Sequence, residues 1–271
     1  MNQPIATSPN NPVIKNIRIL QENSGRQKQE KFLIEGINCL DEAINFDCDL
    51  ESLVINESSM DNESVRQILV KSKDKTKPLI VTEALFKTLT TTSSQCHIMA
   101  IVRKLKYTVQ DCLESIKKGP LLILDCIQDP GNLGSLLRIA SGFDVSGIIL
   151  LKGCVDIYNP KVIRSSAGHI FQTPFIYMNS TQEIIALIKE NKLILSVLTP
   201  TGNTMLCDTH SKAKRALVLG NEGHGINDEL LANAYELIKI PTSSRLESLN
   251  VTISAAIALN HWWSERHGFK A

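Results

Sequence analysis

The first segment of the chain with residue types suited to catalysis is 129–134 (DPGNLG), which leads into a predicted helix that carries Arg138. Gly131 and Gly134 lack a side chain, so the backbone there can approach a ligand closely, and Asn132 is a favourable residue for capping the helix. The guanidinium of Arg138 offers paired donors that match a phosphate group. A capped helix with a surface arginine is the alternative interpretation, and this segment alone does not decide between the two.

A second segment, 219–225 (LGNEGHG), directly follows a predicted apolar strand. Leu219 ends the strand, and Gly220 and Gly223 belong to a run with three glycines in six residues. Such a run disfavours regular secondary structure and exposes the backbone to a ligand. The carboxyl group of Glu222 is expected at the end of the sheet where this strand ends. An ordinary glycine-rich turn is the alternative.

The third segment, 240–251, joins another predicted strand to the last predicted helix. Pro241 ends the strand, Ser248 is placed to cap the helix, and Asn250 lies at the opening of that helix. Backbone N–H groups at a helix start suit an anion or a ligand carboxylate. Taken alone, this segment is also compatible with a simple helix cap.

All three segments lie in the C-terminal half, where a further loop contains Thr199, Pro200 and Gly202. The sequence has no GxGxxG and no GxxxxGK[ST] motif, and dinucleotide-binding folds place their glycine fingerprint at the first strand-to-helix turn. The pattern therefore predicts a nucleotide-like cofactor that is held by late loops.

Two series of alternating strands and helices must position these loops. The first series runs from Phe32 to about Leu105, and the second begins at Pro120 with continuous apolar strands that are typical of a parallel sheet covered on both faces. Residues 107–118 are polar and lysine-rich, which predicts a linker or a short linking helix. The strands expected are 32–34, 53–55, 79–81, 98–102, 121–124, 147–151, 193–198, 216–219 and 237–240; the helices expected are 35–46, 64–73, 83–89, 133–141, 160–168, 182–191, 228–234 and 249–265.

The composition is that of an ordinary globular protein, with 271 residues, 43% hydrophobic and 21% charged residues and a net charge of +1. No apolar run approaches the roughly 20 residues that cross a bilayer, and residues 1–11 lack the apolar core of a signal peptide. We therefore expect a cytoplasmic protein with no membrane segment. The seven scattered cysteines form no CxxC pair and no zinc spacing, which predicts free thiols and no metal site.

Two local basic stretches stand out from this balanced charge. The stretch around residue 74 is interpreted as a solvated face. The earlier one flanks Ser24-Gly25, a predicted turn, and is a candidate for phosphate contacts. Its members are Lys15, Arg18, Arg26, Lys28 and Lys31.

Together, the three segments resemble the motifs of the SpoU (TrmH) family of RNA ribose 2′-O-methyltransferases, within the SPOUT superfamily. Asn132-Leu133-Gly134 with Arg138 resembles the first motif, 220–225 the second, and Ile240-Pro241 with Ser248-Leu249-Asn250 the third; the spacing between them also agrees. Residues 32–36 (FLIEG) resemble the L30e-like substrate-binding domain that many members carry. The resemblance covers essentially the whole chain.

The resemblance implies an L30e-like α/β domain over residues 1–106 and a trefoil-knotted α/β SPOUT domain over residues 119–271. It also implies an obligate homodimer, which fits a last helix that is apolar on nearly every side. The implied cofactor is S-adenosyl-L-methionine. Its predicted binding residues are Thr199, Pro200, Gly202, Leu219, Gly220, Gly223, Ile240 and Leu249, and the predicted catalytic set is Asn132, Arg138, Glu222, Ser248 and Asn250.

The sequence departs from the family pattern at Thr242, where many members have Met, and at Ser244, where many have Gly. The implied substrate is RNA, with 23S ribosomal RNA expected and transfer RNA as the alternative. Two other functions stay open: a non-catalytic RNA-binding protein with the same fold, and a SPOUT enzyme that methylates a base. Because arginine keeps its proton in proteins, we expect Arg138 to clamp a phosphate rather than act as the base.

Overall fold

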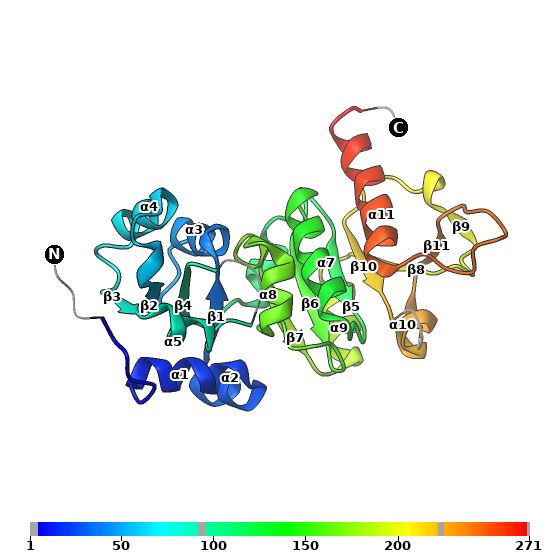
Figure 1. Ribbon diagram of the computed structural model, residues 1–271. Helices are drawn as coiled ribbons and strands as arrows, with labels where there is room; N and C mark the ends of the chain where they lie inside the picture. Colours follow the sequence, from blue (N-terminus) through cyan, green and yellow to red (C-terminus); the bar gives the residue numbers. More distant parts are fainter. Residues whose placement is uncertain (1–4, 92–95, 222–224, 270–271) are drawn as a thin grey trace. The chain divides into compact units, whose positions relative to one another are not determined.

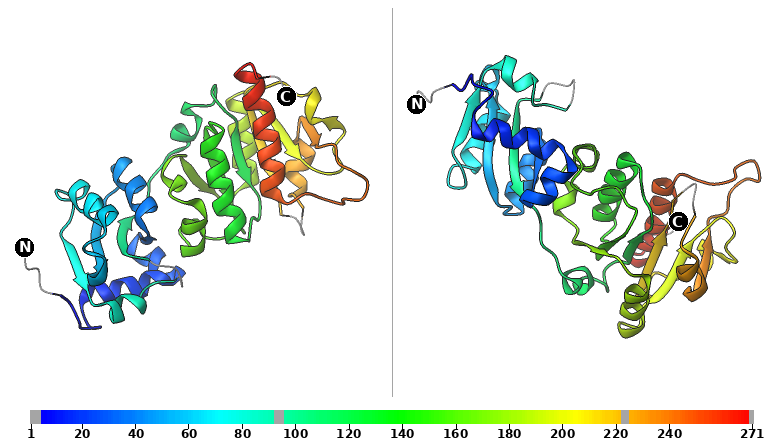
Figure 2. Two further views of the ribbon diagram at one scale, coloured as in Figure 1. Left: turned by 45° about the horizontal axis from the view of Figure 1, so that its top comes forward. Right: turned by 90° about the horizontal axis from the view of Figure 1, so that it is seen from below.

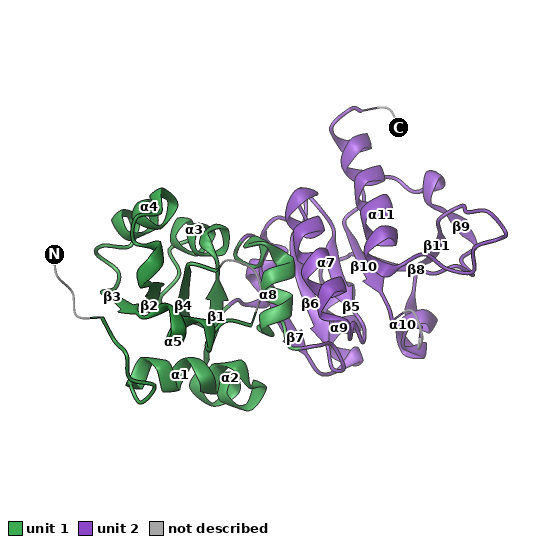
Figure 3. Cartoon of the chain, in the orientation of Figure 1, with its two compact units in different colours: residues 1–106, 156–171 green, residues 107–155, 172–271 purple. Residues whose placement is uncertain are grey.

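The computed structural model describes residues 5–91, 96–221 and 225–269. By their contacts the residues divide into two compact units, which Figure 3 draws in different colours. Unit 1 comprises the chain up to Lys106 together with Asp156–Phe171. Unit 2 comprises Tyr107–Val155 together with the chain from Gln172 onward.

Unit 1 is built on a four-stranded sheet in the order β1-β4-β2-β3, in which β2 and β3 are parallel and the other pairs antiparallel. Figure 1 shows α1 and α5 on one side of this sheet and α3 and α4 on the other. The elements are α1 (Pro12–Gln21), α2 (Asn23–Gln29), β1 (Lys31–Glu35), α3 (Ile37–Asn45), β2 (Leu50–Asn56), η1 (Glu57–Ser59), α4 (Glu63–Lys71), β3 (Pro78–Val81), α5 (Glu83–Lys87), β4 (Ile98–Arg103), α8 (Pro160–Ser166) and η2 (His169–Phe171).

The N-terminal helix α1 was not among the predicted elements, although its start carries a clear local signal. The side chain of Asn11 accepts a hydrogen bond from the backbone N–H of Val13 at 2.9 Å, and proline occupies the first helical position. Ile14, Ile17 and Leu20 then form a fully buried stripe at helical spacing. This stripe joins the core on one face of the sheet.

The prediction of a turn at Ser24-Gly25 and of a phosphate-contacting Arg26 was wrong. Both turn residues lie inside α2, and Arg26 is only 2% exposed. Its guanidinium donates to the carbonyls of Leu20 and Gln21, at 3.0 and 2.8 Å, and its Nε donates to Asp156 Oδ2 at 2.8 Å. Arg26 is therefore a buried structural cation that fixes the corner between α1 and α2.

Unit 2 is built on a seven-stranded parallel sheet in the order β7-β6-β5-β10-β8-β11-β9. The edge strands β7 and β9 were not predicted, because they are short and partly exposed. The elements are α6 (Val109–Glu114), β5 (Leu121–Leu124), α7 (Pro130–Gly142), β6 (Gly147–Leu151), β7 (Phe175–Met178), α9 (Thr181–Glu190), β8 (Ile194–Leu198), β9 (Thr204–Met205), η3 (Leu206–Asp208), β10 (Arg215–Leu219), α10 (Asp228–Asn233), β11 (Glu236–Lys239) and α11 (Val251–Arg266).

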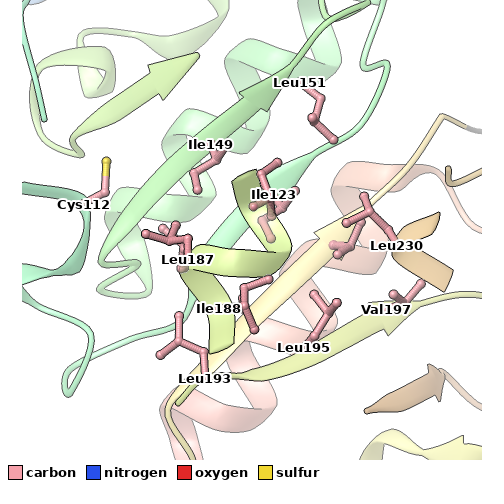
Figure 4. Close-up of a cluster of buried hydrophobic side chains, with 14 of the residues drawn as sticks. Cys112, Ile123, Ile149, Leu151, Leu187, Ile188, Leu193, Leu195, Val197 and Leu230 are labelled. Carbon is pink, nitrogen blue, oxygen red and sulfur yellow. The ribbon is translucent and has the colours of Figure 1, made fainter. Parts of the chain in front are cut away.

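Helices cover both faces of this sheet, as its continuous apolar strands predict. On one face, α9 buries Leu187 and Ile188 and α10 buries Leu230 against strand residues such as Ile123 and Leu195 (Figure 4). Helix α6 adds Cys112 to the same core. On the other face α11 packs beside α7, as the left view of Figure 2 shows. None of the described helices is both long and apolar enough to cross a membrane.

The compact units differ from the sequence-based domain boundaries at two places. Residues 107–118, predicted as a linker or a short linking helix, contain α6, whose first turn has a capping box between Thr108 and Asp111. This helix buries Cys112 in the unit 2 core, so the segment belongs to that unit. The segment Asp156–Phe171, predicted to be part of the second domain, belongs to unit 1. In this segment the ring of Tyr158 packs against the ring of Phe32, with 4.6 Å between the ring centroids, which accounts for that assignment.

Candidate active site

A cavity of about 590 Å³ opens at the carboxyl ends of β8, β10 and β11. These ends lie side by side because Val218 pairs with Val197 and Ile238 pairs with Leu198 in the parallel register. The volume is within the range of about 300–1,000 Å³ that is usual for small-molecule and cofactor sites. Of the predicted site residues, those that line the cavity are Thr199, Pro200, Leu219, Gly220, Ile240, Ser248 and Leu249.

The loop after β8 contributes Thr199 and Pro200 to the cavity wall. The backbone N–H of Thr199 donates to Ile238 O at 2.9 Å, which holds the start of the loop against β11. Gly202 does not line the cavity. A side-chain carbon at Gly202 would lie 2.6 Å from the carbonyl oxygen of Leu237, so this glycine is required for close packing of the loop on β11. Its role in cofactor binding stays a prediction.

The loop after β10 turns sharply at Gly220. A side-chain carbon there would lie 2.3 Å from Ile226 Cγ1 and 2.5 Å from the carbonyl oxygen of Gly225. Asn221 and Gly225 exchange two backbone hydrogen bonds, of 3.1 and 2.9 Å, that close the loop. The predicted residues Glu222 and Gly223 lie outside the described residues.

Two polar contacts tie this loop to the loop that follows β5. The side-chain Nδ2 of Asn221 donates to Cys126 O at 2.9 Å. The buried carboxylate of Asp125 accepts from the backbone N–H of Asn227 at 2.7 Å. Our prediction missed Asn221 and Asp125. Asp125 directly follows the predicted strand 121–124 and Asn221 follows the predicted strand 216–219 by two residues, and these positions were the available signal.

The loop after β11 is the most open wall of the site. Residues 241–248 are all exposed, and the backbone N–H of Leu246 donates to Ser243 O at 3.0 Å. Thr242 and Ser244, the two departures from the family pattern, both line the cavity. Ser244 has no positive φ, so a serine fits this loop path without backbone strain.

The helix caps differ from the predicted ones. Asp129, not Asn132, caps α7, since its side chain accepts from the backbone N–H of Asn132 at 2.8 Å. Asn250, not Ser248, caps α11 and accepts from the backbone N–H of Thr252 at 2.9 Å. The structure nonetheless joins two predicted catalytic residues, because Asn250 Nδ2 donates to Asn132 Oδ1 at 3.1 Å.

Arg138 lies two turns into α7 with an exposed side chain. It does not line the cavity and makes no hydrogen bond or ion pair with any other residue in the described part of the chain. The guanidinium is therefore available to a ligand outside this cavity. The structure brings together Asn132 and Asn250, places Ser248 on the cavity wall, and leaves Arg138 apart from them.

The thiols beside the site are not suited to nucleophilic catalysis. Burial raises the pKa of the Cys154 thiol to about 11, and desolvation with the neighbouring Asp125 carboxylate raises the pKa of Cys126. Thiols with raised pKa values stay protonated near neutral pH, and the thiolate is the reactive form. The cavity wall is lined instead by amide, hydroxyl and backbone groups together with the charged side chains of Asp228, Lys239 and Glu247. Amide and hydroxyl groups can orient reactants by hydrogen bonds without forming a covalent bond to them.

Comparison with known proteins agrees with this geometry. The family model of the SpoU rRNA Methylase family matches residues 119–260. That of the MRM3-like substrate binding domain matches residues 11–100. The chain is 27% identical to the 23S rRNA (guanosine(2553)-2′-O)-methyltransferase RlmP of Bacillus subtilis, over 94% of this chain and 97% of that one.

Solved structures show the same similarity. An S-adenosylmethionine-bound rRNA methyltransferase from Sinorhizobium meliloti superimposes with a TM-score of 0.85 at 26% identity, over 98% of this chain and 99% of that one. An RNA 2′-O ribose methyltransferase superimposes with a TM-score of 0.83 at 28% identity, over 97% of this chain and all of that one. With its motif loops gathered at one sheet edge and the family model matched over more than half its length, the chain belongs to the SpoU rRNA methylase family.

Proposed function

We propose that this protein is an S-adenosyl-L-methionine-dependent RNA 2′-O-ribose methyltransferase that acts on 23S ribosomal RNA. The observation that carries the proposal is the cavity at the ends of three adjacent parallel strands, with the linked amides of Asn132 and Asn250 beside it. The printed activities of RlmP and of the solved 2′-O ribose methyltransferase support the reaction type, and RlmP supports the substrate.

The cavity residues fit the proposed cofactor. Leu219, Ile226 and Leu249 provide apolar wall for an adenine ring. Backbone groups at Gly220 and Ile240 lie at strand ends, where N–H and C=O groups without a sheet partner can hold the polar edges of a nucleoside. The cofactor supplies a methyl group already activated by the sulfonium. The protein therefore needs to orient the reactants and to allow removal of one proton, that of the ribose 2′-hydroxyl.

Orientation of the ribose hydroxyl is the main task of this chain. Good alignment of two reactants can supply about 7–11 kcal/mol of the barrier reduction. Ser248 offers a hydroxyl on the cavity wall, and Asn132 offers an amide next to the α11 cap. In our proposal these groups would bind and orient the 2′-hydroxyl at the cavity, and its proton would pass to an RNA phosphate oxygen or a water.

Arg138 has the properties of a phosphate clamp. Its guanidinium is exposed on α7 and has no partner among the described residues, so both ends of its donor fork are available. Because arginine does not release its proton in proteins, a role as general base is physically unfavourable. We therefore assign it to the phosphate beside the target ribose.

Unit 1 is the proposed RNA-binding unit, in keeping with its match to a substrate-binding domain. Lys15, Arg18 and Lys28 are exposed on α1 and α2 and form what we call the α1–α2 basic face. None of the three has an ion-pair partner among the described residues, whereas the nearby Lys31 pairs with Glu51 at 2.5 Å. Unpaired cations on a fixed helix pair suit the RNA backbone.

A homodimer, together with the trefoil knot implied by the resemblance, forms part of this proposal. Helix α11 buries Val251, Ala255 and Leu259 yet also exposes Ile253 by 50% and Ile257 by 39%. Exposed isoleucines four residues apart form an apolar strip on one helix face, which suits a second copy of the chain. A second copy would also supply Arg138 to the partner's cavity.

The activity is tested by incubating purified protein with ribosomal RNA and methyl-labelled S-adenosylmethionine and then digesting the RNA. We expect label in an alkali-resistant dinucleotide, because a 2′-O-methyl group blocks cleavage of its linkage. Label in an alkali-sensitive methylated base would contradict the proposal. Mapping 2′-O-methyl sites in cells with and without the gene tests the substrate, and a change confined to transfer RNA would replace 23S ribosomal RNA.

A further inference from the structure

A chain of hydrogen bonds links the starts of α7 and α11. Asn250 Oδ1 accepts from the backbone N–H of Thr252 at 2.9 Å and also from the Thr252 hydroxyl. Asn250 Nδ2 donates to Asn132 Oδ1 at 3.1 Å, and the backbone N–H of Asn132 donates to Asp129 at 2.8 Å. Asn132, Asn250 and Thr252 are all half-buried.

This chain fixes the orientation of both amides. A backbone N–H is only a donor, so the Asn250 atom that it contacts must be oxygen and the other end of that amide must be NH₂. That NH₂ group is only a donor, so the Asn132 atom opposite it must be oxygen as well. The NH₂ group of Asn132 is therefore left over, and no described residue accepts a hydrogen bond from it.

We propose that Thr252 is a positioning residue for methyl transfer, which acts through Asn250 to turn the two N–H donors of Asn132 toward an acceptor oxygen of the RNA sugar–phosphate backbone. The inference rests on the proposed function and deepens it. Asn132 then serves as a donor and not as an acceptor. The Thr252 hydroxyl contributes the second of two hydrogen bonds that hold Asn250 in its orientation.

The matched variants are Thr252→Val, which removes the hydroxyl but keeps the branched shape, and Thr252→Ser, which keeps the hydroxyl. With Thr252→Val we expect kcat for RNA methylation to fall about fivefold, the rate equivalent of one neutral hydrogen bond. Cofactor Kd should stay at the wild-type value, and Tm should fall by no more than about 2–4 °C, since the backbone N–H of Thr252 still reaches the cap. Thr252→Ser should restore kcat.

A double-mutant cycle separates positioning from a general structural effect. Asn132→Asp keeps an oxygen atom facing Asn250 but replaces the NH₂ group of Asn132 by a second carboxylate oxygen. The variant therefore lacks the N–H donors that Thr252 is proposed to orient. On that background Thr252→Val should cause no further loss of kcat. An equal fivefold loss on both backgrounds, or wild-type kcat in Thr252→Val, would overturn the inference.

A readout without RNA keeps this inference separable from the proposed function. The ¹⁵N–¹H signals of the Asn250 side-chain amide should shift in Thr252→Val and return in Thr252→Ser, whether or not the wild-type protein methylates RNA. Unchanged amide signals in Thr252→Val would refute the positioning role. If the signals shift but the wild-type protein transfers no methyl group, the proposed function fails instead.

Discussion

Gly220 gives the sharpest test of how the cofactor cavity is built, through the substitution Gly220→Ala. The added carbon would lie 2.3 Å from Ile226 Cγ1 and 2.5 Å from the carbonyl oxygen of Gly225. The isoleucine side chain can rotate away, but the carbonyl belongs to a loop closed by two hydrogen bonds between Asn221 and Gly225. Relief therefore requires displacement of the loop that forms one wall of the cavity.

The expected cost follows from overpacking, which typically destabilises a protein by about 1–3 kcal/mol. If the free protein relaxes by moving the loop, binding must restore the loop against the same energy. The cofactor Kd should then rise roughly 5- to 150-fold, at about 1.4 kcal/mol for each tenfold change. Isothermal titration with S-adenosylmethionine measures this rise, and circular dichroism measures the accompanying change in Tm.

Gly142→Ala is the matched control for this experiment. A side-chain carbon at Gly142, at the end of α7, meets no heavy atom within 4 Å. This variant should keep the wild-type Kd and gain up to about 1 kcal/mol of stability, because alanine loses less backbone entropy than glycine. Wild-type cofactor affinity in Gly220→Ala would refute the packing argument, as would an equal loss of affinity in Gly142→Ala.

The remaining predictions test the phosphate clamp, the RNA-binding face and one acid-sensitive contact. Arg138→Lys should lower kcat/KM for RNA at least tenfold at unchanged cofactor Kd, because lysine lacks the bidentate fork; near-full turnover would exclude the clamp. Replacing the three cations of the α1–α2 basic face by alanine should reduce the slope of log K against log salt for RNA binding by about 2–3, at about 0.7–0.9 for each lost phosphate contact, whereas Lys73→Ala with Lys77→Ala should leave the slope unchanged. A backbone hydrogen bond from Ser211 lowers the pKa of Glu265 below its ordinary value of 4.5. The stabilisation that results is present above that value and is lost as pH falls through the folded pKa. In Glu265→Gln the free energy of unfolding should therefore decrease less steeply as the pH is lowered through the acid range.

Local pattern was sufficient for much of the fold. The buried strand Leu121–Leu124 is a continuous apolar run, and so are residues 216–219 of the strand Arg215–Leu219. Both strands are predicted within a residue of their observed bounds. Strand Phe175–Met178 was missed because an edge strand is exposed on one side, with Tyr177 48% exposed, so its apolar pattern is incomplete. The burial of Arg26 could not be predicted from the local sequence, because its partner Asp156 lies 130 residues away in the chain.

The helix caps were predicted wrongly for a different reason. A capping residue is present before both α7 and α11, but the prediction chose a neighbouring residue in each case. Proline favours the first helical position, so the residue before Pro130 is the natural cap of α7, and Asp129 fills that role. At α11 the choice between Ser248 and Asn250 depended on where the helix begins, and boundaries are the least certain part of sequence-based assignment. The distinction matters, because the cap position fixes the orientation of the Asn250 amide.

The site itself is a consequence of strand order rather than of any one loop. Leu124 pairs with Leu219, so the loop after β5 emerges beside the loop after β10. Contacts across sequence separations of 95, 102 and 118 residues then brace the loops: Asn221 to Cys126, Asn227 to Asp125, and Asn250 to Asn132. Each of these contacts joins the segment that follows one strand to the segment that follows another, so the order of the strands in the buried sheet fixes the arrangement. Each loop taken alone therefore looks like a plain turn or a capped helix, and the binding cavity exists only where the strand ends meet.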